Sequence, residues 1–215
     1  MTDTKVIVIA SRKGGAGKST LAAHMSVLAD SEDIPALCVD LDPQGSLAFW
    51  HGLREQQTPV LATATARELP SLIDAAKADG VEWVIVDTMP HNAPDITAAL
   101  KLADLALVPS RPAAFDIAGV SGTLDLLAAV DVPHMLILNS CPPRRANEPA
   151  IVSEARAALT SLGANVWTGQ ISQRVAFSHA IITGQAVQEF EPEGKAAIEM
   201  ATLWQAVTDE TRGTK

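Results

Sequence analysis

Cysteine is scarce in this chain of 215 residues, which contains only Cys38 and Cys141. Cys38 lies in an apolar run and Cys141 in a predicted loop, so the pair forms neither a disulfide framework nor a metal-ligand spacing. The histidines are scattered too, without ligand spacing, and we interpret them as core or surface residues. They are His24, His51, His91, His134 and His179. These absences argue against a disulfide scaffold and against a zinc or iron–sulfur site.

Long hydrophobic runs are also absent, since no segment reaches the ~18 apolar residues of a membrane span. The chain enters its first apolar run, Val6–Ala10, almost at once, which argues against a signal peptide and an N-terminal helix-turn-helix domain. The last segment, Trp204–Lys215, contains Asp209 and Glu210 and lacks the basic amphipathic pattern of a membrane-binding helix. We therefore expect a cytoplasmic protein with no membrane partner.

Positive charge is in short supply. The chain has 16 Lys and Arg residues against 25 Asp and Glu residues, which gives a net charge of −9 and a pI of about 4.9. A nucleic-acid-binding domain normally carries the opposite balance. Any contact with DNA would therefore have to come from a local basic patch.

What is present indicates a single α/β domain over residues 1–215. The hydrophobic content of 47% and the charged content of 19% are typical of a globular chain, and the length suits one domain with a sizeable core. Helical stretches separate most of the apolar runs, so we predict a mostly parallel, twisted sheet with helices on both faces. The predicted strands are Val6–Ala10, Ala36–Leu41, Val60–Ala62, Trp83–Asp87, Leu105–Val108, Met135–Leu138 and Val166–Trp167.

The most informative stretch is Lys13–Thr20, which reads KGGAGKST. It joins the strand-like run Lys5–Ala10 to a helix that we predict over Ser19–Asp30. A glycine-rich turn at such a junction points backbone N–H groups at a bound anion, and the helix dipole adds to the attraction. The alternative interpretation is a tight glycine turn with a solvated lysine. The order of strand, loop and helix favours a loop that binds a nucleoside triphosphate, ATP or ADP.

Individual residues of this loop suit individual parts of the nucleotide. The glycines let the backbone wrap the phosphates without Cβ clashes, while Lys18 would reach the β- and γ-phosphates. The Ser19 hydroxyl would bind Mg²⁺. We predict nucleotide contacts from the whole stretch: Lys13, Gly14, Gly15, Ala16, Gly17, Lys18, Ser19 and Thr20.

The loop carries a second lysine, Lys13, and has Arg12 where the strict phosphate-loop pattern requires glycine. The sequence K-G-G-x-G-K-S-T resembles the deviant Walker A motif of the ParA/MinD superfamily. That resemblance implies that Lys13 crosses a sandwich homodimer to reach the partner subunit's nucleotide. A cation supplied in this way would couple dimerisation to the bound nucleotide. The alternative is a surface lysine that only raises the local positive potential.

Two more segments end apolar runs with aspartate. Asp40 and Asp42 lie in DLDPQG, which resembles switch I of ParA proteins, and Asp87 ends WVIVD at the Walker B position. The resemblance implies that Asp42 positions or deprotonates the attacking water and that Asp40 supports the metal site. Asp87 would hold a water bound to Mg²⁺. The sequence after Asp87 is Thr88-Met89-Pro90, a departure from the family's D-x-P-P.

The second half of the chain extends the resemblance to the short plasmid-partition ATPases, which lack an N-terminal DNA-reading domain. The segment Val108–Pro112 is similar to a proline-containing segment that contributes to their subunit interface. Ile171–Arg174 and Gly194–Glu199 resemble their C-terminal region. Asn139 follows a predicted strand where the superfamily places an asparagine on the purine base, although it could equally be a turn residue.

The resemblance also implies non-specific DNA binding by the ATP dimer, through a basic surface doubled by the two-fold axis. The candidate residues are Arg144, Arg145, Arg156, Arg174 and Lys195, of which Arg174 matches best. Each of these could instead be an ordinary solvated charge.

The resulting hypothesis is an ATPase that dimerises on ATP, associates with the nucleoid and segregates or positions a plasmid, a chromosome or another large cargo. A centromere-binding or cargo adaptor protein would stimulate its slow hydrolysis. The alternative is a metabolic ligase on the same fold, similar to dethiobiotin synthetase or a cobyrinate amidase. Lys13 and the short chain argue against the ligase. The nitrogenase iron protein shares the loop, but its cluster cysteines have no counterparts here.

Overall fold

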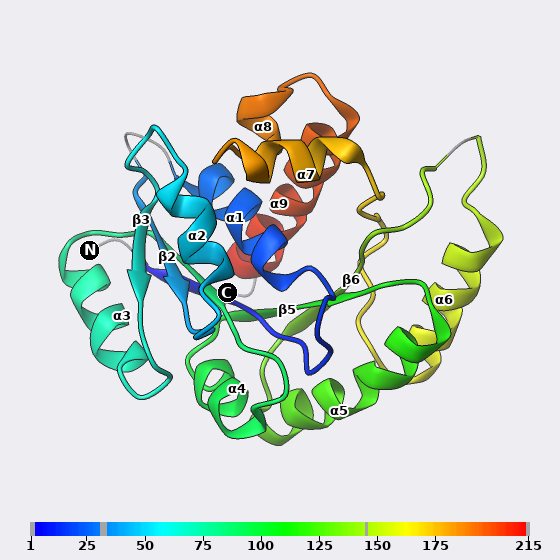
Figure 1. Ribbon diagram of the computed structural model, residues 1–215. Coiled ribbons are helices and arrows are strands. Elements are labelled where there is room, and N and C mark those ends of the chain that lie inside the picture. The colour runs from blue at the N-terminus through cyan, green and yellow to red at the C-terminus, as the bar shows by residue number, and fades with distance from the viewer. Residues whose placement is uncertain (1–2, 31–33, 145, 214–215) are drawn as a thin grey trace.

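In this computed structural model, residues 3–30, 34–144 and 146–213 are described (Figure 1). The described strands form one parallel sheet in the order β3-β2-β4-β1-β5-β6. The strands are β1 (Lys5–Ile9), β2 (Ala36–Asp40), β3 (Val60–Thr63), β4 (Trp83–Asp87), β5 (Leu105–Ser110) and β6 (His134–Leu138). The helices are α1 (Lys18–Ala29), α2 (Ser46–Gly52), α3 (Leu69–Ala78), α4 (Ala93–Leu100), α5 (Ala114–Val130), α6 (Ala150–Ser161), α7 (Val175–Ile182), α8 (Val187–Phe190) and α9 (Lys195–Gly213).

Helices cover both faces of the sheet, as Figure 1 shows, with α3 to α6 on one face and α1, α2 and α7 to α9 on the other. Side chains alternate along β1, so that Val6 and Val8 enter one core and Ile7 and Ile9 enter the other. Strands buried on both faces are apolar at nearly every position, which explains why the sequence shows continuous apolar runs. The predicted single-domain α/β fold with helices on both faces is confirmed.

One predicted strand is wrong. Val166–Trp167 forms no strand, although Val166 makes an isolated parallel bridge with Leu136. The segment makes two backbone hydrogen bonds to β6, from Leu136 N to Asn165 O (2.7 Å) and from Trp167 N to Leu136 O (2.9 Å). The chain then turns, and the Trp167 ring packs so closely over Gly169 that a Cβ there would clash with it. The segment therefore covers the outer edge of β6 without extending the sheet.

The strand order brings distant loops to one edge. β1 pairs with β4 and β5, and β4 also pairs with β2, so the segments after these strands all lie at the carboxyl edge of the sheet. The register places Asp87 opposite both Ile9 and Asp40. Ligands of parallel α/β sheets bind at this edge. None of the described helices is long and apolar enough to cross a lipid bilayer.

Candidate nucleotide-binding site

The chain leaves β1 and enters α1 through a loop that only glycine can form at two places. Gly15 and Gly17 have φ angles of 72° and 97°, in the left-handed region that favours glycine. Gly17 is also the N-cap of α1, and a Cβ there would overlap the side-chain amide of Asn139. The loop therefore presents the free N–H groups of a helix start to the carboxyl edge, as an anion site requires.

A pocket of about 830 Å³ opens beside this loop. It is formed by the loop, by the segments after β2, β5 and β6, and by α7. Its lining includes Gly14, Gly15, Gly17, Lys18, Ser19, Thr20, Asp42, Arg111, Asn139, Arg174 and Phe177. Most of the residues predicted to contact nucleotide thus line one cavity. Ala16 is buried beneath the loop instead, and Lys13 lies outside the lining.

Lys18 and Asp87 are two buried charges beneath the loop. Lys18 is 6% exposed, and burial lowers the pKa of its ammonium group, although the charges of Asp87 and Asp42 raise it. Burial raises the pKa of Asp87 to about 7, against the opposing influence of the nearby Ser19 hydroxyl and the Lys18 charge. Perturbed pKa values of this kind are typical of sites that handle charged ligands.

The carboxylate of Asp87 is also unsatisfied. It is 0% exposed, and neither oxygen accepts a hydrogen bond from any described residue. A buried unpaired carboxylate is costly unless a ligand or an ordered water completes its hydrogen bonds. No group of three or more acidic, histidine or cysteine ligands occurs among the described residues. These residues suit Mg²⁺, which binds through one or two protein oxygens together with waters and phosphates rather than in an all-protein cage.

The segment after β2 is ordered by its own aspartates. Asp40 accepts hydrogen bonds from the backbone N–H groups of Asp42 (2.9 Å) and Ala48 (3.0 Å). The pKa of Asp40 is raised by burial, which these bonds partly oppose. Asp42 in turn accepts from Gln44 N (2.9 Å) through Oδ1 and lines the pocket. Asp40 therefore fixes the start of α2, and its carboxylate presents Asp42 toward the nucleotide cavity.

Two cations of the loop lie against α5. Gly119 and Gly122 are one turn apart on this helix, and a Cβ at Gly119 would lie 3.8 Å from Cδ of Lys13. A Cβ at Gly122 would lie 2.6 Å from Nη1 of Arg12. Arg12 N also donates to the Thr123 hydroxyl (3.1 Å). The missing side chains of α5 thus create the space that the stems of Arg12 and Lys13 occupy.

Asn139 contacts the phosphate loop directly. It is 7% exposed, and its Nδ2 donates to Ala16 O over 2.8 Å. Its backbone N–H is held by Ser110 O (2.8 Å). Asn139 also lines the pocket, a position that permits contact with a purine base. That contact stays a prediction.

The predicted DNA-contacting cations differ in how far they are neutralised. Arg174 and Arg156 form ion pairs with Glu199 (2.6 Å) and Glu148 (3.0 Å). Arg174 moreover lines the nucleotide pocket. Arg144 and Lys195 are exposed and form no ion pair with a described residue. Arg145 lies outside the described residues.

Several residues of the pocket lining were not assigned to it from the sequence, among them His91, Arg111 and Phe177. His91, interpreted as core or surface, lies beside the loop, where a Cβ at Gly14 would be 3.7 Å from its Nε2. Arg111 donates a hydrogen bond to Gly15 O, and Phe177 of α7 also lines the pocket. Arg111 directly follows a predicted strand, which places it at the carboxyl edge of the sheet. Only the strand order shows that this strand lies next to the one before the phosphate loop.

Comparison with known proteins identifies the family of the chain. Residues 7–187 match the CobQ/CobB/MinD/ParA nucleotide binding domain. Protein ParA of Rhizobium radiobacter is 30% identical over 182 residues, which cover 80% of each chain. The maintenance of carboxysome distribution protein A of Gloeobacter kilaueensis is 29% identical over 211 residues, 96% of this chain and 93% of the relative.

Solved structures share the fold at lower identity. Apo McdA of Cyanothece superposes with a TM-score of 0.78 at 17% identity, covering 95% of this chain and 99% of that chain. Cell division ATPase MinD of Pyrococcus furiosus gives 0.76 at 19%, covering 95% and 98%. Cobyrinic acid a,c-diamide synthase of Mycobacterium smegmatis, solved with ADP and magnesium, gives 0.69 at 20%, covering 99% and 97%. Taken with the glycine loop and its buried charges, the family match shows that the chain belongs to the CobQ/CobB/MinD/ParA nucleotide-binding family, the family of the ParA- and MinD-type ATPases.

Proposed function

We propose that this protein is a ParA/MinD-type ATPase that dimerises on ATP and positions or partitions a large cargo. The observation that carries the proposal is the second lysine of the loop, Lys13, next to a pocket that Lys18 and Asp42 already line. One cation suffices to bind a nucleotide. A second cation outside the pocket lining suits a nucleotide presented by another subunit.

The chemistry would use residues that are already in position. Lys18 would bind the β- and γ-phosphates, and Ser19 and Asp87 would hold Mg²⁺. When bound, the cation neutralises charge on the phosphates. Asp42 orients or deprotonates the attacking water, since its Oδ1 is held by Gln44 N and its other oxygen accepts no bond from a described residue. Hydrolysis is slow until a partner completes the site.

Two variants separate binding from turnover. Lys18→Ala should abolish ATP binding, measured by calorimetry with Mg²⁺ present. Asp42→Ala should bind ATP like the wild type but stop hydrolysis, which traps the ATP state. Turnover by Asp42→Ala at the wild-type rate would show that another group activates the water.

The dimer is tested through Lys13. Lys13→Gln should bind ATP with a modest loss but should fail to dimerise with a non-hydrolysable ATP analogue in sedimentation velocity. Lys77→Gln is the matched control, because Lys77 is an exposed lysine on α3. Normal dimerisation of Lys13→Gln would reduce Lys13 to a surface charge.

The proposed DNA binding and the proposed adaptor protein are inferred from the resemblance to ParA-type ATPases. The ATP dimer would bind nucleoid DNA without sequence preference, and a centromere-binding or cargo adaptor protein would release it by stimulating hydrolysis. Since Arg174 is already paired with Glu199, Arg144 and Lys195 are the stronger contributors to a basic patch. DNA binding by the Asp42→Ala dimer should fall steeply between ~50 and ~200 mM salt. No binding at the lower concentration would exclude a nucleoid-associated state.

A metabolic ligase of the cobyrinate-amidase kind is the second candidate, because the Mycobacterium smegmatis synthase has the same fold. Lys13 argues against it, since a ligase has no use for a cation that serves another subunit. ATP hydrolysis stimulated by DNA together with an adaptor, rather than by a carboxylate substrate and an amine donor, would decide for the switch.

A further inference from the structure

Arg111 brings one more cation to the phosphate loop. It follows β5 directly, and β5 lies beside β1 in the sheet, so the segments after these strands are neighbours. The guanidinium of Arg111 donates through Nη2 to Gly15 O. A Cβ at Gly15 would lie only 3.4 Å from the same nitrogen. The side chain is therefore held against the loop by this bond, although the residue itself is exposed.

The charge of Arg111 is not neutralised by the protein. No carboxylate of the described residues forms an ion pair with it, whereas Arg54, Arg156, Arg174 and Arg212 each have one. A guanidinium has five N–H donors, and one bond to a carbonyl leaves most of them unused. Arg111 also lines the nucleotide pocket, together with Gly15 and Lys18.

We propose that Arg111 is a further catalytic residue of this ATPase, which binds the terminal phosphates of the nucleotide in its own subunit. The inference rests on the proposed function, because it needs ATP in this pocket. The hydrogen bond to Gly15 O fixes one edge of the guanidinium and leaves the other edge for phosphate oxygens. Such charge-assisted bonds are about twice as strong as neutral ones.

The γ-phosphate gains most from this arrangement. Negative charge spreads over its equatorial oxygens during transfer, and a guanidinium fixed in advance stabilises that charge without reorganising. ADP lacks the γ-phosphate, so the loss of Arg111 should weaken ATP binding more than ADP binding. The planar fork also makes lysine a poor replacement, since it keeps the charge but loses the paired donors.

The experiment compares Arg111→Gln, Arg111→Lys and wild type in ATP and ADP titrations with Mg²⁺ and in single-turnover hydrolysis. Glutamine keeps an N–H donor for Gly15 O but removes the charge. We expect Arg111→Gln to bind ATP about tenfold more weakly, ADP nearly unchanged, and to hydrolyse at least about tenfold more slowly. Arg111→Lys should fall between the two. Arg67→Gln, an exposed arginine outside the pocket lining, is the control.

Arg111→Gln is also compared with Arg111 in a Lys13→Gln background, which tests whether Arg111 contacts the nucleotide of its own subunit. A contact within one subunit predicts the same loss of ATP affinity in protein that does not dimerise. A loss confined to dimer-forming protein would overturn the inference in favour of an interface role. Equal losses for ATP and ADP with a lower melting temperature would make Arg111 structural. If wild type binds no ATP, the proposed function fails first.

Discussion

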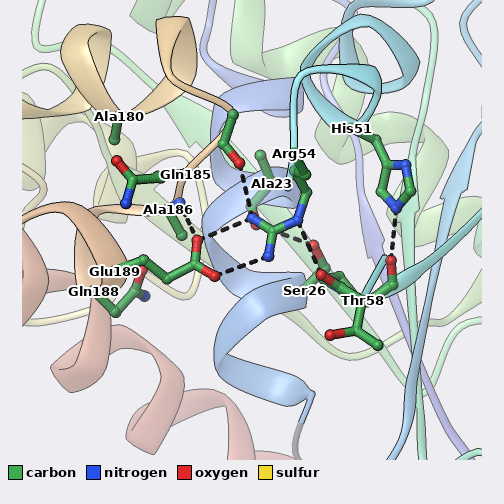
Figure 2. Close-up of polar contacts among 12 residues, drawn as sticks. Ala23, Ser26, His51, Arg54, Thr58, Ala180, Gln185, Ala186, Gln188 and Glu189 are labelled. Atoms are coloured by element: carbon green, nitrogen blue, oxygen red, sulfur yellow. Dashed lines mark hydrogen bonds and ion pairs between the residues drawn. The ribbon is translucent and has the colours of Figure 1, made fainter. Parts of the chain in front are cut away.

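Two regions of this protein bury charged side chains, and they treat them in opposite ways. In the first, Arg54 is joined to Glu189 by two hydrogen bonds of 2.9 and 2.8 Å, and it also donates to Thr58 O and Gly184 O (Figure 2). Its guanidinium lies 4.9 Å from the centre of the Trp50 ring. In the second, the Asp87 carboxylate accepts no bond from a described residue.

The difference separates structure from function. The Arg54 cluster ties the segment after α2 to Glu189 of α8 and to Gly184 before that helix. Trp50 of α2 reinforces the link by donating to Gln185 O (3.1 Å). Partial burial alone would raise the pKa of Glu189, but the hydrogen bonds from Arg54 and from Ala186 N outweigh it and lower the pKa. Contacts within the protein thus use four of the five N–H donors of Arg54. Neither oxygen of Asp87 has a hydrogen-bond partner among the described residues, so both can accept a bond from a ligand or a water. Leaving a buried carboxylate in this state costs folding stability.

The largest expected effect comes from breaking the satisfied cluster. Arg54→Ala leaves Glu189 without its partner, and removal of one member of a buried pair costs about 3–5 kcal/mol of unfolding free energy. The Arg54 side chain is 2% exposed. Urea unfolding, monitored by circular dichroism, measures the loss.

Arg212→Ala is the matched control for Arg54→Ala. Arg212 also pairs with a glutamate, Glu82, and also lies over a tryptophan, Trp83, at 5.5 Å from the ring centre. Its side chain is 57% exposed, however, so solvent screens the pair and the loss should not exceed about 1 kcal/mol. Equal losses in the two variants would show that burial does not distinguish them.

The second prediction concerns the unsatisfied carboxylate. The pKa of Asp87 is about 7 in the folded protein and near 3.8 when the residue is unperturbed. Between these values the folded state binds more protons than the unfolded state, so stability falls as the pH rises from about 4 to 7. Asp87→Asn removes this penalty and should stabilise the nucleotide-free protein by roughly 2–4 kcal/mol at pH 8.

Urea unfolding of Asp87→Asn and wild type at pH 5 and pH 8, without nucleotide, checks this. The advantage of the variant should be less than half as large at pH 5 as at pH 8, while its ATP hydrolysis is lost. Asp125→Asn, on the exposed face of α5, should change neither quantity. A destabilised Asp87→Asn protein at pH 8 would mean that the carboxylate has a partner after all.

The charged residues of both regions differ in how well the sequence predicts them. Lys18, Asp42 and Asp87 could be found because a short motif fixes each relative to its own strand. The strand Val60–Ala62 and the helix after the phosphate loop were predicted within one or two residues of β3 and α1. Local signals of this kind need no knowledge of the tertiary arrangement.

Residues brought together by strand order could not be found in this way. Arg111 approaches Gly15 across 96 positions of sequence, and Arg54 reaches Glu189 across 135. No spacing rule covers such distances, and a buried arginine looks like any surface arginine in the sequence. The prediction of a strand at Val166–Trp167 was wrong for a related reason. These apolar residues lie beside β6 and form only a single bridge, from Val166 to Leu136, rather than a strand.

The smallest predicted effect is the change of folding stability with pH that His24 causes. His24 lies beside the Arg54 cluster. Its Nδ1 accepts from Val187 N (3.2 Å), whereas its buried Nε2 has no partner among the described residues. Burial lowers the pKa of His24 to about 3, although the charge of Glu189 raises it. Below its ordinary pKa of 6.5 the unfolded state takes up a proton that the folded state refuses, so stability falls as the pH falls, by about 2 kcal/mol at pH 5.

His24→Asn keeps an acceptor for Val187 N but has no proton to gain. The variant should be less stable than wild type at pH 7.5, since it loses the ring contact with Phe177 at 5.2 Å, and this deficit should shrink by about 2 kcal/mol at pH 5. The slope is opposite in sign to that of Asp87→Asn over the same pH range. His179→Asn, an exposed histidine on α7, should leave the slope unchanged. A deficit that stays constant between pH 7.5 and 5 would mean that His24 is protonated inside the fold, and the contrast between the two regions would then fail.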